Sequence, residues 1–328
     1  MALSANFVDA HISRWEAYLR RQHRAYREKW PSRLFHHAPI ENAVKILQDG
    51  NLRSRLDPQS KRTRDVAAAG VIDNRADAHQ YARLYFRPKT PTQYHIEGIR
   101  KTNECSYGEA THAPVLIMFV FDAKAVLSRE GIMFCDQNMQ KDEASPGDTE
   151  EYFSSIPFEK VYHEGGIGGD YSIISHRCAE VLAPSPLPLE EALQWIYCRS
   201  IAEKETLLEM LGADAEIWSK KIIISNDVLV FERKFVFVDE VTLSPERILF
   251  RFNSRADRAP VDVQVSVKDA KGTQLIKFRN SAMNPSPDPP ATRWRLDCKF
   301  PNGTYWVEIR LEGHLAYRAH VTLGDDLF

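Results

Sequence analysis

Three polar side chains have types and neighbours that suit catalysis or binding. Glu180 is flanked by apolar residues on both sides, and a carboxylate in such a strand can face a cleft and serve as an acid or a base. His36 ends a short apolar segment, and Arg75 follows an apolar pair. Each also has a structural interpretation: a glutamate on an edge strand, a histidine with satisfied hydrogen bonds, and an arginine on the surface. Spacing alone does not choose between these interpretations.

Several common kinds of site are not indicated by the sequence. It contains no GxxxxGK[ST], HExxH or GxSxG pattern, and the glycines in Gly165–Gly169 lack the strand and helix of a dinucleotide fingerprint. The five cysteines are scattered, without a CxxC pair, so neither a disulfide framework nor a zinc site is expected. We therefore expect a site without a metal.

The composition predicts an ordinary globular protein. The 328 residues carry a net charge of −2, with 43% hydrophobic and 27% charged residues, and this length suggests about two domains. The longest apolar run, Val115–Phe121, is far shorter than the ~20 residues that span a bilayer. The N-terminus has no basic region followed by an apolar stretch, so we expect a cytoplasmic protein without a membrane segment.

The elements that must position these side chains form a mixed first domain, residues 1–213. Leu34–His37 predicts a strand, and Glu41–Gln48 predicts a helix that ends at Gly50. Ala76–Tyr85 is compatible with a helix, and Val115–Phe121 predicts a central buried strand.

A different pattern begins at residue 214. Short alternating segments separated by Lys271-Gly272, Asn302-Gly303 and Glu312-Gly313 predict an antiparallel, immunoglobulin-like β-sandwich over residues 214–328. No catalytic constellation lies there, so an accessory or recognition domain is expected.

Four segments, taken in order, resemble the DarT family of DNA ADP-ribosyltransferase toxins. They are LFHHAPIENAVKILQDG (Leu34–Gly50), HQYARLYFRPKTP (His79–Pro91), GIMFCDQNM (Gly131–Met139) and HRCAEVLAP (His176–Pro184). The first resembles a motif that pairs a histidine at a strand end with an asparagine and a closing glycine. The last resembles the motif that carries the family's catalytic glutamate. Ala38 and Thr92 depart from the family pattern, which has Thr and Met at these places.

The resemblance implies an α+β ADP-ribosyltransferase fold with two small sheets, flanking helices and NAD in the cleft between the sheets. It implies that ADP-ribose passes from NAD to a thymine or guanine base of single-stranded DNA. It also implies a bacterial toxin or phage-defence effector that is paired with a separately encoded macrodomain antitoxin.

The resemblance also implies roles for individual residues. Glu180 and Arg75 are the catalytic candidates, and Arg62 or Arg64 could take the place of Arg75 at the NAD phosphates. The candidates for NAD binding are His36, Asn42, Arg75, Tyr81 and Tyr85. A carboxylate suits this reaction, because cleavage of the nicotinamide–ribose bond creates an oxocarbenium-like centre.

Basic residues near these motifs are candidates for contact with the nucleic acid. They are Arg53, Arg55, Arg62, Arg64, Arg87 and Lys89. Basic groups interleaved with aromatic residues suit a groove for a single strand, whereas a solvated charged face is the plainer interpretation. Two other functions stay open: an ADP-ribosyltransferase that acts on RNA or protein, and a catalytically degenerate sensor or binding protein.

Overall fold

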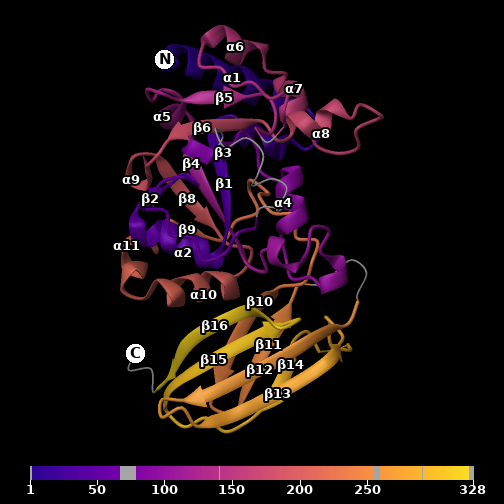
Figure 1. Ribbon diagram of the computed structural model, residues 1–328. Helices are drawn as coiled ribbons and strands as arrows, with labels where there is room; N and C mark the ends of the chain where they lie inside the picture. The colour runs from indigo at the N-terminus through magenta and orange to yellow at the C-terminus, as the bar shows by residue number, and fades with distance from the viewer. Residues whose placement is uncertain (1, 67–78, 140, 254–258, 290, 325–328) are drawn as a thin grey trace. The chain divides into compact units, whose positions relative to one another are not determined.

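The computed structural model describes residues 2–66, 79–139, 141–253, 259–289 and 291–324, which fall into two compact units (Figure 1). The first unit comprises Met1–His95, Ile117–Tyr197 and Ser225–Glu232, and the second comprises Ile96–Leu116, Cys198–Ile224 and Arg233–Phe328. The two units therefore interleave along the chain, whereas the sequence suggests one division between residues 213 and 214.

One sheet organises the first unit. Its strands run β5-β6-β3-β1-β4-β8, and the pairings β1–β3, β3–β6, β5–β6 and β4–β8 are antiparallel (Figure 1). Strands β2 and β7 form a separate antiparallel pair. We expected two small sheets, but β3 hydrogen-bonds to both β1 and β6 and joins most strands into one. The strands are β1 (Arg33–Pro39), β2 (Asn51–Leu52), β3 (Tyr81–Tyr85), β4 (Leu116–Asp122), β5 (Met133–Cys135), β6 (Glu180–Pro184), β7 (Leu187–Pro188) and β8 (Leu193–Tyr197).

The helix expected near Glu41–Gln48 is confirmed as α2 (Ile40–Asp49). Its buried side chains recur at helical spacing, and Gly50 ends it in the left-handed conformation with a φ of 69°. The helix expected over Ala76–Tyr85 is wrong for its second half, since Tyr81–Tyr85 is strand β3; residues 76–78 lie outside the described residues. Alternation of larger polar side chains with Ala82 and Leu84 has period two, which is typical of a strand.

The other helices of the first unit are short, except for the first. They are α1 (Ala5–Arg20), α4 (Pro91–Ile96), α5 (Ala123–Leu127), α6 (Glu150–Ser155), α7 (Phe158–Val161), α8 (Ser172–His176) and α9 (Leu189–Ala192), with a 3-10 helix at Ala25–Lys29. Among all helices that the structure describes, none has the length and apolar character needed to cross a membrane.

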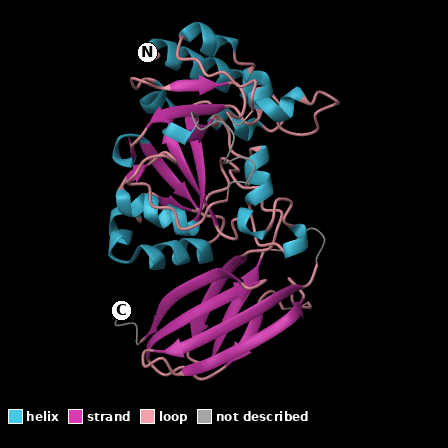
Figure 2. Ribbon diagram, viewed as in Figure 1, coloured by secondary structure: helices cyan, strands magenta, loops and turns pink. Residues whose placement is uncertain are grey.

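The second unit is built mainly from strands (Figure 2). One sheet has the order β10-β11-β14 and the other has the order β13-β12-β15-β16, with antiparallel pairings throughout. Residues of both sheets, such as Phe250 and Val265, share one buried core. The strands are β10 (Val238–Ser244), β11 (Arg247–Phe252), β12 (Val261–Asp269), β13 (Gln274–Met283), β14 (Trp294–Asp297), β15 (Gly303–Leu311) and β16 (His314–Leu323). The unit also contains α10 (Ile201–Leu211), α11 (Ala215–Trp218) and the two-residue strand β9 (Ile222–Ile223).

Candidate active site

Glu180 is the first residue of β6, and its side chain is fully buried, with 0% exposed. In the sheet it lies opposite Tyr85 of β3 on one side and Cys135 of β5 on the other. Residues directly opposite in a sheet point to the same face, so Tyr85 and Cys135 flank the carboxylate. The strand therefore places an acidic group inside the sheet, where a charge needs partners.

Both carboxylate oxygens of Glu180 have hydrogen-bond donors. The Arg83 guanidinium donates through Nη2 to Oε1, in an ion pair, and the backbone N–H of Met139 donates to Oε2 at 3.1 Å. The same Nη2 donates to Oδ1 of Asn138 at 3.1 Å. Burial disfavours the charge on Arg83, but the carboxylate of Glu180 outweighs this effect and raises the pKa of Arg83 above its usual value. The arrangement thus pairs a fully buried carboxylate with a guanidinium.

Two adjacent histidines of β1 have different contacts. Nδ1 of His36 lies 2.9 Å from the backbone oxygen of Arg83, whereas the His37 ring stacks on Tyr85 at 5.4 Å between centroids. Burial lowers the pKa of His36 to about 4 and that of His37 to about 3. Both rings are therefore neutral at pH 7. His36 therefore contacts Arg83, which pairs with Glu180. His37 contacts Tyr85, which is buried and lies opposite Glu180 in the sheet.

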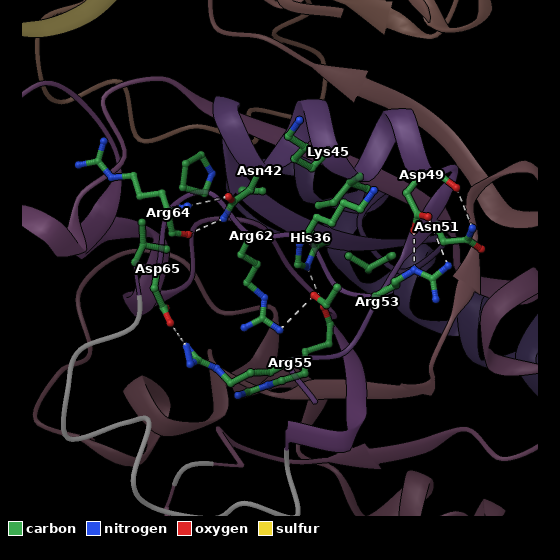
Figure 3. Close-up of a pocket in the computed structure, with 18 of the residues that line it drawn as sticks. His36, Asn42, Lys45, Asp49, Asn51, Arg53, Arg55, Arg62, Arg64 and Asp65 are labelled. Atoms are coloured by element: carbon green, nitrogen blue, oxygen red, sulfur yellow. Dashed lines mark hydrogen bonds and ion pairs between the residues drawn. The ribbon is translucent and has the colours of Figure 1, made fainter. Parts of the chain in front are cut away.

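A cavity of about 240 Å³ lies beside these strands (Figure 3). Its walls come from the end of β1, from α2, from the segment between β2 and residue 66, and from β3. Arg83 lines the cavity and also holds Glu180, so it connects the two. The predicted site residues that line it are His36, Asn42, Arg53, Arg55, Arg62, Arg64 and Tyr81. Within the described residues, no group of three or more His, Cys, Asp or Glu side chains is placed to hold a metal ion.

Asn42 fixes one wall of this cavity. Its Oδ1 accepts the backbone N–H groups of Thr63 and Arg64 at 2.9 and 3.0 Å, and its Nδ2 donates to the Arg64 carbonyl at 2.6 Å (Figure 3). The side-chain amide therefore clamps the backbone at residues 63 and 64 onto α2. Its effect on a ligand would pass through the position of that segment.

The arginines that line the cavity differ in whether a carboxylate pairs with their positive charge. Arg53 pairs with Asp49 at 2.6 Å and with Asp57 at 3.1 Å, and Arg55 pairs with Asp65. Figure 3 shows Arg64 directed away from Arg62, whose own side chain points toward Arg55.

Arg62 has hydrogen bonds to the Ser54 carbonyl at 3.0 Å and to Ser60 Oγ at 3.4 Å. It has no carboxylate partner among the residues that the structure describes. Burial lowers the pKa of Arg62, and the neighbouring Arg55 adds to this effect. Arg62 is thus a solvent-accessible cation on the cavity wall that an anionic ligand would neutralise.

The structure does not bring every predicted residue to the cavity. Arg75 lies outside the described residues. Arg87 is 2% exposed, and its guanidinium donates to the carbonyls of Pro88, Val161 and His163. Arg87 thus supports the interior, in a position that a nucleic acid does not reach. Lys89 forms an ion pair with Glu164 at 3.3 Å.

Arg83, Asn138 and His37 are site residues that the sequence did not reveal. The signal for Arg83 is the segment Tyr81-Ala82-Arg83-Leu84-Tyr85, in which polar and aromatic side chains alternate with small apolar ones. An interpretation of this segment as a helix hides that signal, since it sends Arg83 and Tyr85 to different faces. Asn138 belongs to a segment that the resemblance already singles out, without a role for this residue.

A family model matches the part of the chain that contains these residues. The family model described as "ssDNA thymidine ADP-ribosyltransferase, DarT" matches residues 35–230, which is more than half of the chain. The protein is therefore a DNA ADP-ribosyltransferase, with an ADP-ribosyltransferase fold of mixed α and β content. More particularly, it belongs to the DarT family.

Solved structures give a weaker likeness. "Thermus sp. 2.9 DarT in complex with ADP-ribosylated ssDNA" is 20% identical, with a TM-score of 0.48, over 60% of this chain and 96% of that chain. The complex of the same Thermus protein with NAD⁺ is 18% identical, with a TM-score of 0.46, over 60% of this chain and 97% of that chain. With TM-scores below 0.5, these likenesses add nothing to the family match. A comparison with curated proteins gives no match.

Proposed function

We propose that this protein transfers ADP-ribose from NAD to a thymidine base of single-stranded DNA, with Glu180 as the catalytic carboxylate. One observation carries the proposal: a fully buried carboxylate is held by Arg83, which itself lines an arginine-rich cavity. The family described for thymidine supports this base. A guanine base, RNA and protein are the alternative acceptors.

The reaction breaks one bond and forms another at C1′ of the nicotinamide ribose. The C1′–N bond to nicotinamide breaks, and nicotinamide leaves with the electron pair. A new bond forms from C1′ to a ring nitrogen of the base, which loses its proton. Glu180 would stabilise the positive charge that develops at C1′, and a carboxylate there can accept the proton that the base releases.

We assign the NAD pyrophosphate to Arg62. Its guanidinium faces the cavity without a carboxylate partner among the described residues, and arginine binds phosphate oxygens through two parallel hydrogen bonds. Arg75 stays a candidate from its place in the sequence. The cavity of about 240 Å³ is smaller than ordinary ligand pockets of roughly 300–1,000 Å³, so part of the dinucleotide would extend beyond it.

The other NAD contacts follow from positions on the cavity wall. His36 and Tyr81 line the cavity, and we propose that they contact the riboses and the nicotinamide. Tyr85 is buried beside Glu180, so we propose that it supports the carboxylate from its own strand. Asn42 would act through the segment at residues 63 and 64 that it clamps.

For the DNA, we propose contacts at the segment between β2 and residue 66. Arg53, Arg55 and Arg64 lie there on the cavity wall. The carboxylates beside Arg53 and Arg55 reduce the local positive charge, so base stacking and shape would contribute alongside phosphate contacts. Arg87 and Lys89 are not part of this proposal, because carbonyls and Glu164 already occupy them.

We further propose a bacterial toxin or phage-defence effector that a separately encoded macrodomain antitoxin counteracts. Residues 1–213 would carry the chemistry, and residues 214–328 would form an immunoglobulin-like recognition module. Two antiparallel sheets with a common core support such a module.

The test uses the full chain and NAD labelled in its adenylate part. It is incubated separately with single-stranded DNA, RNA and a protein mixture, and the DNA is then digested to nucleosides for mass spectrometry. We expect the label on DNA and the added mass on thymidine. Glu180→Gln should fold normally and lose transfer by about 10³-fold or more, because it removes charge stabilisation and the proton acceptor together.

Each other outcome changes a definite part of the proposal. Added mass on deoxyguanosine would replace the base, and label on RNA or protein would replace the acceptor. Transfer at the normal rate by Glu180→Gln would refute the role of this carboxylate. Absence of label from every acceptor would favour the degenerate sensor.

A further inference from the structure

Arg83 is the group that connects the cavity to Glu180. The carboxylate is fully buried, whereas the side chain of Arg83 is 21% exposed and lines the cavity. Nη2 of Arg83 donates to both Glu180 and Asn138. The backbone carbonyl oxygen of Arg83 lies 2.9 Å from Nδ1 of His36. Arg83 is therefore next to both the cavity and the carboxylate.

The turn Asp136–Met139 covers the other side of the carboxylate. The Met139 N–H donates to Glu180 Oε2, and the Met139 side chain is 1% exposed in a cluster with Cys135 and Leu182. At the start of the turn, Nδ1 of His176 lies 2.9 Å from the Asp136 carbonyl oxygen. The turn is therefore anchored at both ends, and Arg83 binds it in the middle through Asn138.

We propose that Arg83 is a positioning residue for the transfer reaction. Its guanidinium holds the Glu180 carboxylate and the Asn138 side chain together, so that the buried carboxylate keeps a counter-charge and one orientation beside the turn Asp136–Met139. This inference rests on the proposed role of Glu180. Arg83 would affect the rate of the chemical step, whereas Arg62 and the other residues of the cavity would determine the affinity for NAD.

Charge and geometry both matter in this role. Removal of Arg83 would leave the carboxylate buried with the Met139 N–H but without its cation, which disfavours the ionised form. A lysine would keep the positive charge, but its side chain reaches less far than that of arginine, and its ammonium lacks the planar array of donors of a guanidinium. Arg83→Lys should therefore restore part of what Arg83→Gln loses.

The experiment compares full-length Arg83→Gln and Arg83→Lys with the unchanged protein. Calorimetry measures the Kd of NAD, and single-turnover transfer to a thymidine-containing oligonucleotide measures the rate. For Arg83→Gln we expect a rate about 10²-fold lower, with the Kd of NAD unchanged within about threefold. For Arg83→Lys we expect about a tenth of the normal rate. Arg21→Gln, an exchange of the same type at an exposed position of the first unit, should change neither quantity.

A double variant adds a second readout. If Arg83 acts through Glu180, then Arg83→Gln added to Glu180→Gln should lower the rate little further, because the two side chains act as one unit. Independent actions would instead multiply the two losses. Should Arg83→Gln fail to fold in a thermal melt, the Arg83→Lys rate and Kd decide the question alone.

Three results would overturn the inference. They are a normal rate in either Arg83 variant, a loss of NAD affinity that accounts for the loss of rate, and multiplied losses in the double variant. The second would make Arg83 an NAD-binding residue instead. These failures differ from failure of the proposed function, which would appear as normal transfer by Glu180→Gln alone.

Discussion

Each unit of the molecule contains an arginine–glutamate pair whose carboxylate is fully buried, and the two pairs differ in their surroundings. In the second unit, Arg199 precedes α10 and pairs with Glu203, four residues further on, and with the buried Glu97 at 3.9 Å. Arg199 also donates its backbone N–H to Glu203 at 3.0 Å and its Nη2 to the Pro114 carbonyl at 2.6 Å. Both side chains are sealed, at 1% and 0% exposed. This pair completes the start of a helix.

The pair in the first unit has a different construction. Arg83 and Glu180 are 97 residues apart in the sequence, they come from neighbouring strands, and one of them opens onto a cavity. The comparison teaches that burial of charge is not by itself a sign of function. Access to a cavity from one member of the pair separates a candidate active site from a structural pair.

The first test of this comparison disrupts the buried Arg199–Glu203 pair. Glu203→Gln removes the nearest counter-charge of Arg199 and leaves the more distant Glu97 carboxylate, 3.9 Å away, so we expect a loss of about 3 kcal/mol of unfolding free energy. The double variant Arg199→Met/Glu203→Leu should recover part of this loss, because it removes both charges of the pair. The recovery is incomplete, since the Pro114 carbonyl, the backbone N–H of residue 199 and the Glu97 carboxylate each lose one contact. Urea unfolding followed by circular dichroism measures both.

Transfer activity supplies the contrast. At temperatures where the chain is folded, the double variant at 199 and 203 should modify DNA within about threefold of the normal rate. The analogous replacement of Arg83 and Glu180 by Met and Leu should be comparably stable and inactive. An inactive but folded Arg199→Met/Glu203→Leu protein would show that the sealed pair takes part in function, and the comparison would fail.

The second test sharpens the comparison at the cavity itself. Arg62 lines the cavity without an ion pair to a carboxylate among the described residues, whereas Arg53 is neutralised by Asp49 and Asp57. Arg62→Gln should weaken NAD binding by about tenfold to a hundredfold, because a charge-assisted hydrogen bond contributes about 1.5–3 kcal/mol. Calorimetric titration with NAD measures the change.

Arg53→Gln is the matched control for this effect. Its guanidinium is engaged by two carboxylates, so we expect the Kd of NAD to change by less than about threefold. If instead Arg53→Gln weakens binding more than Arg62→Gln does, the pyrophosphate lies at the other end of the cavity and the assignment to Arg62 is wrong.

The sequence predicts single elements of this site better than the contacts between them. Glu180 could be found because its apolar neighbours predict a strand, and α2 because its apolar spacing and Gly50 agree on one helix. The ion pair to Arg83 depends on the register of β3 with β6, and no local pattern contains that register.

Burial of charged groups is the other feature that the sequence leaves open. Arg87 and Arg62 both follow polar or aromatic residues in basic segments, yet one is enclosed by three carbonyls and the other lines a cavity. The interleaving of the two units is equally hidden, because the segment 96–116 joins the second unit through contacts such as the bridge between Ile99 and Val236. Such contacts depend on tertiary packing, which pattern alone does not encode.

The third and smallest effect concerns protonation of His36. Its folded-state pKa is about 4 because burial disfavours the charged ring, against an ordinary value of 6.5. Between these two values the unfolded chain binds a proton that the folded chain does not bind. Stability is therefore complete above about pH 6.5 and falls as the pH drops toward 4, by at most about 1.4 kcal/mol per pH unit for one group.

His36→Gln isolates this contribution, because a glutamine keeps a hydrogen-bond donor for the Arg83 carbonyl and does not titrate. We expect the stability of the variant to fall less steeply than that of the unchanged protein between pH 6.5 and 5.5, by about 1 kcal/mol over that interval. His37 and His11, whose pKa values burial also lowers to about 3, titrate in both proteins and cancel in the difference. Equal stability slopes for the two proteins between pH 6.5 and 5.5 would mean that the folded-state pKa of His36 is not lowered, so that its ring gains a proton over the same pH range as in the unfolded chain. At pH values below about 6.5, the polar cluster around Glu180 would then contain a second cation, His36, beside Arg83. The Arg83–Glu180 pair would then differ from the Arg199–Glu203 pair in having two positive groups near its carboxylate.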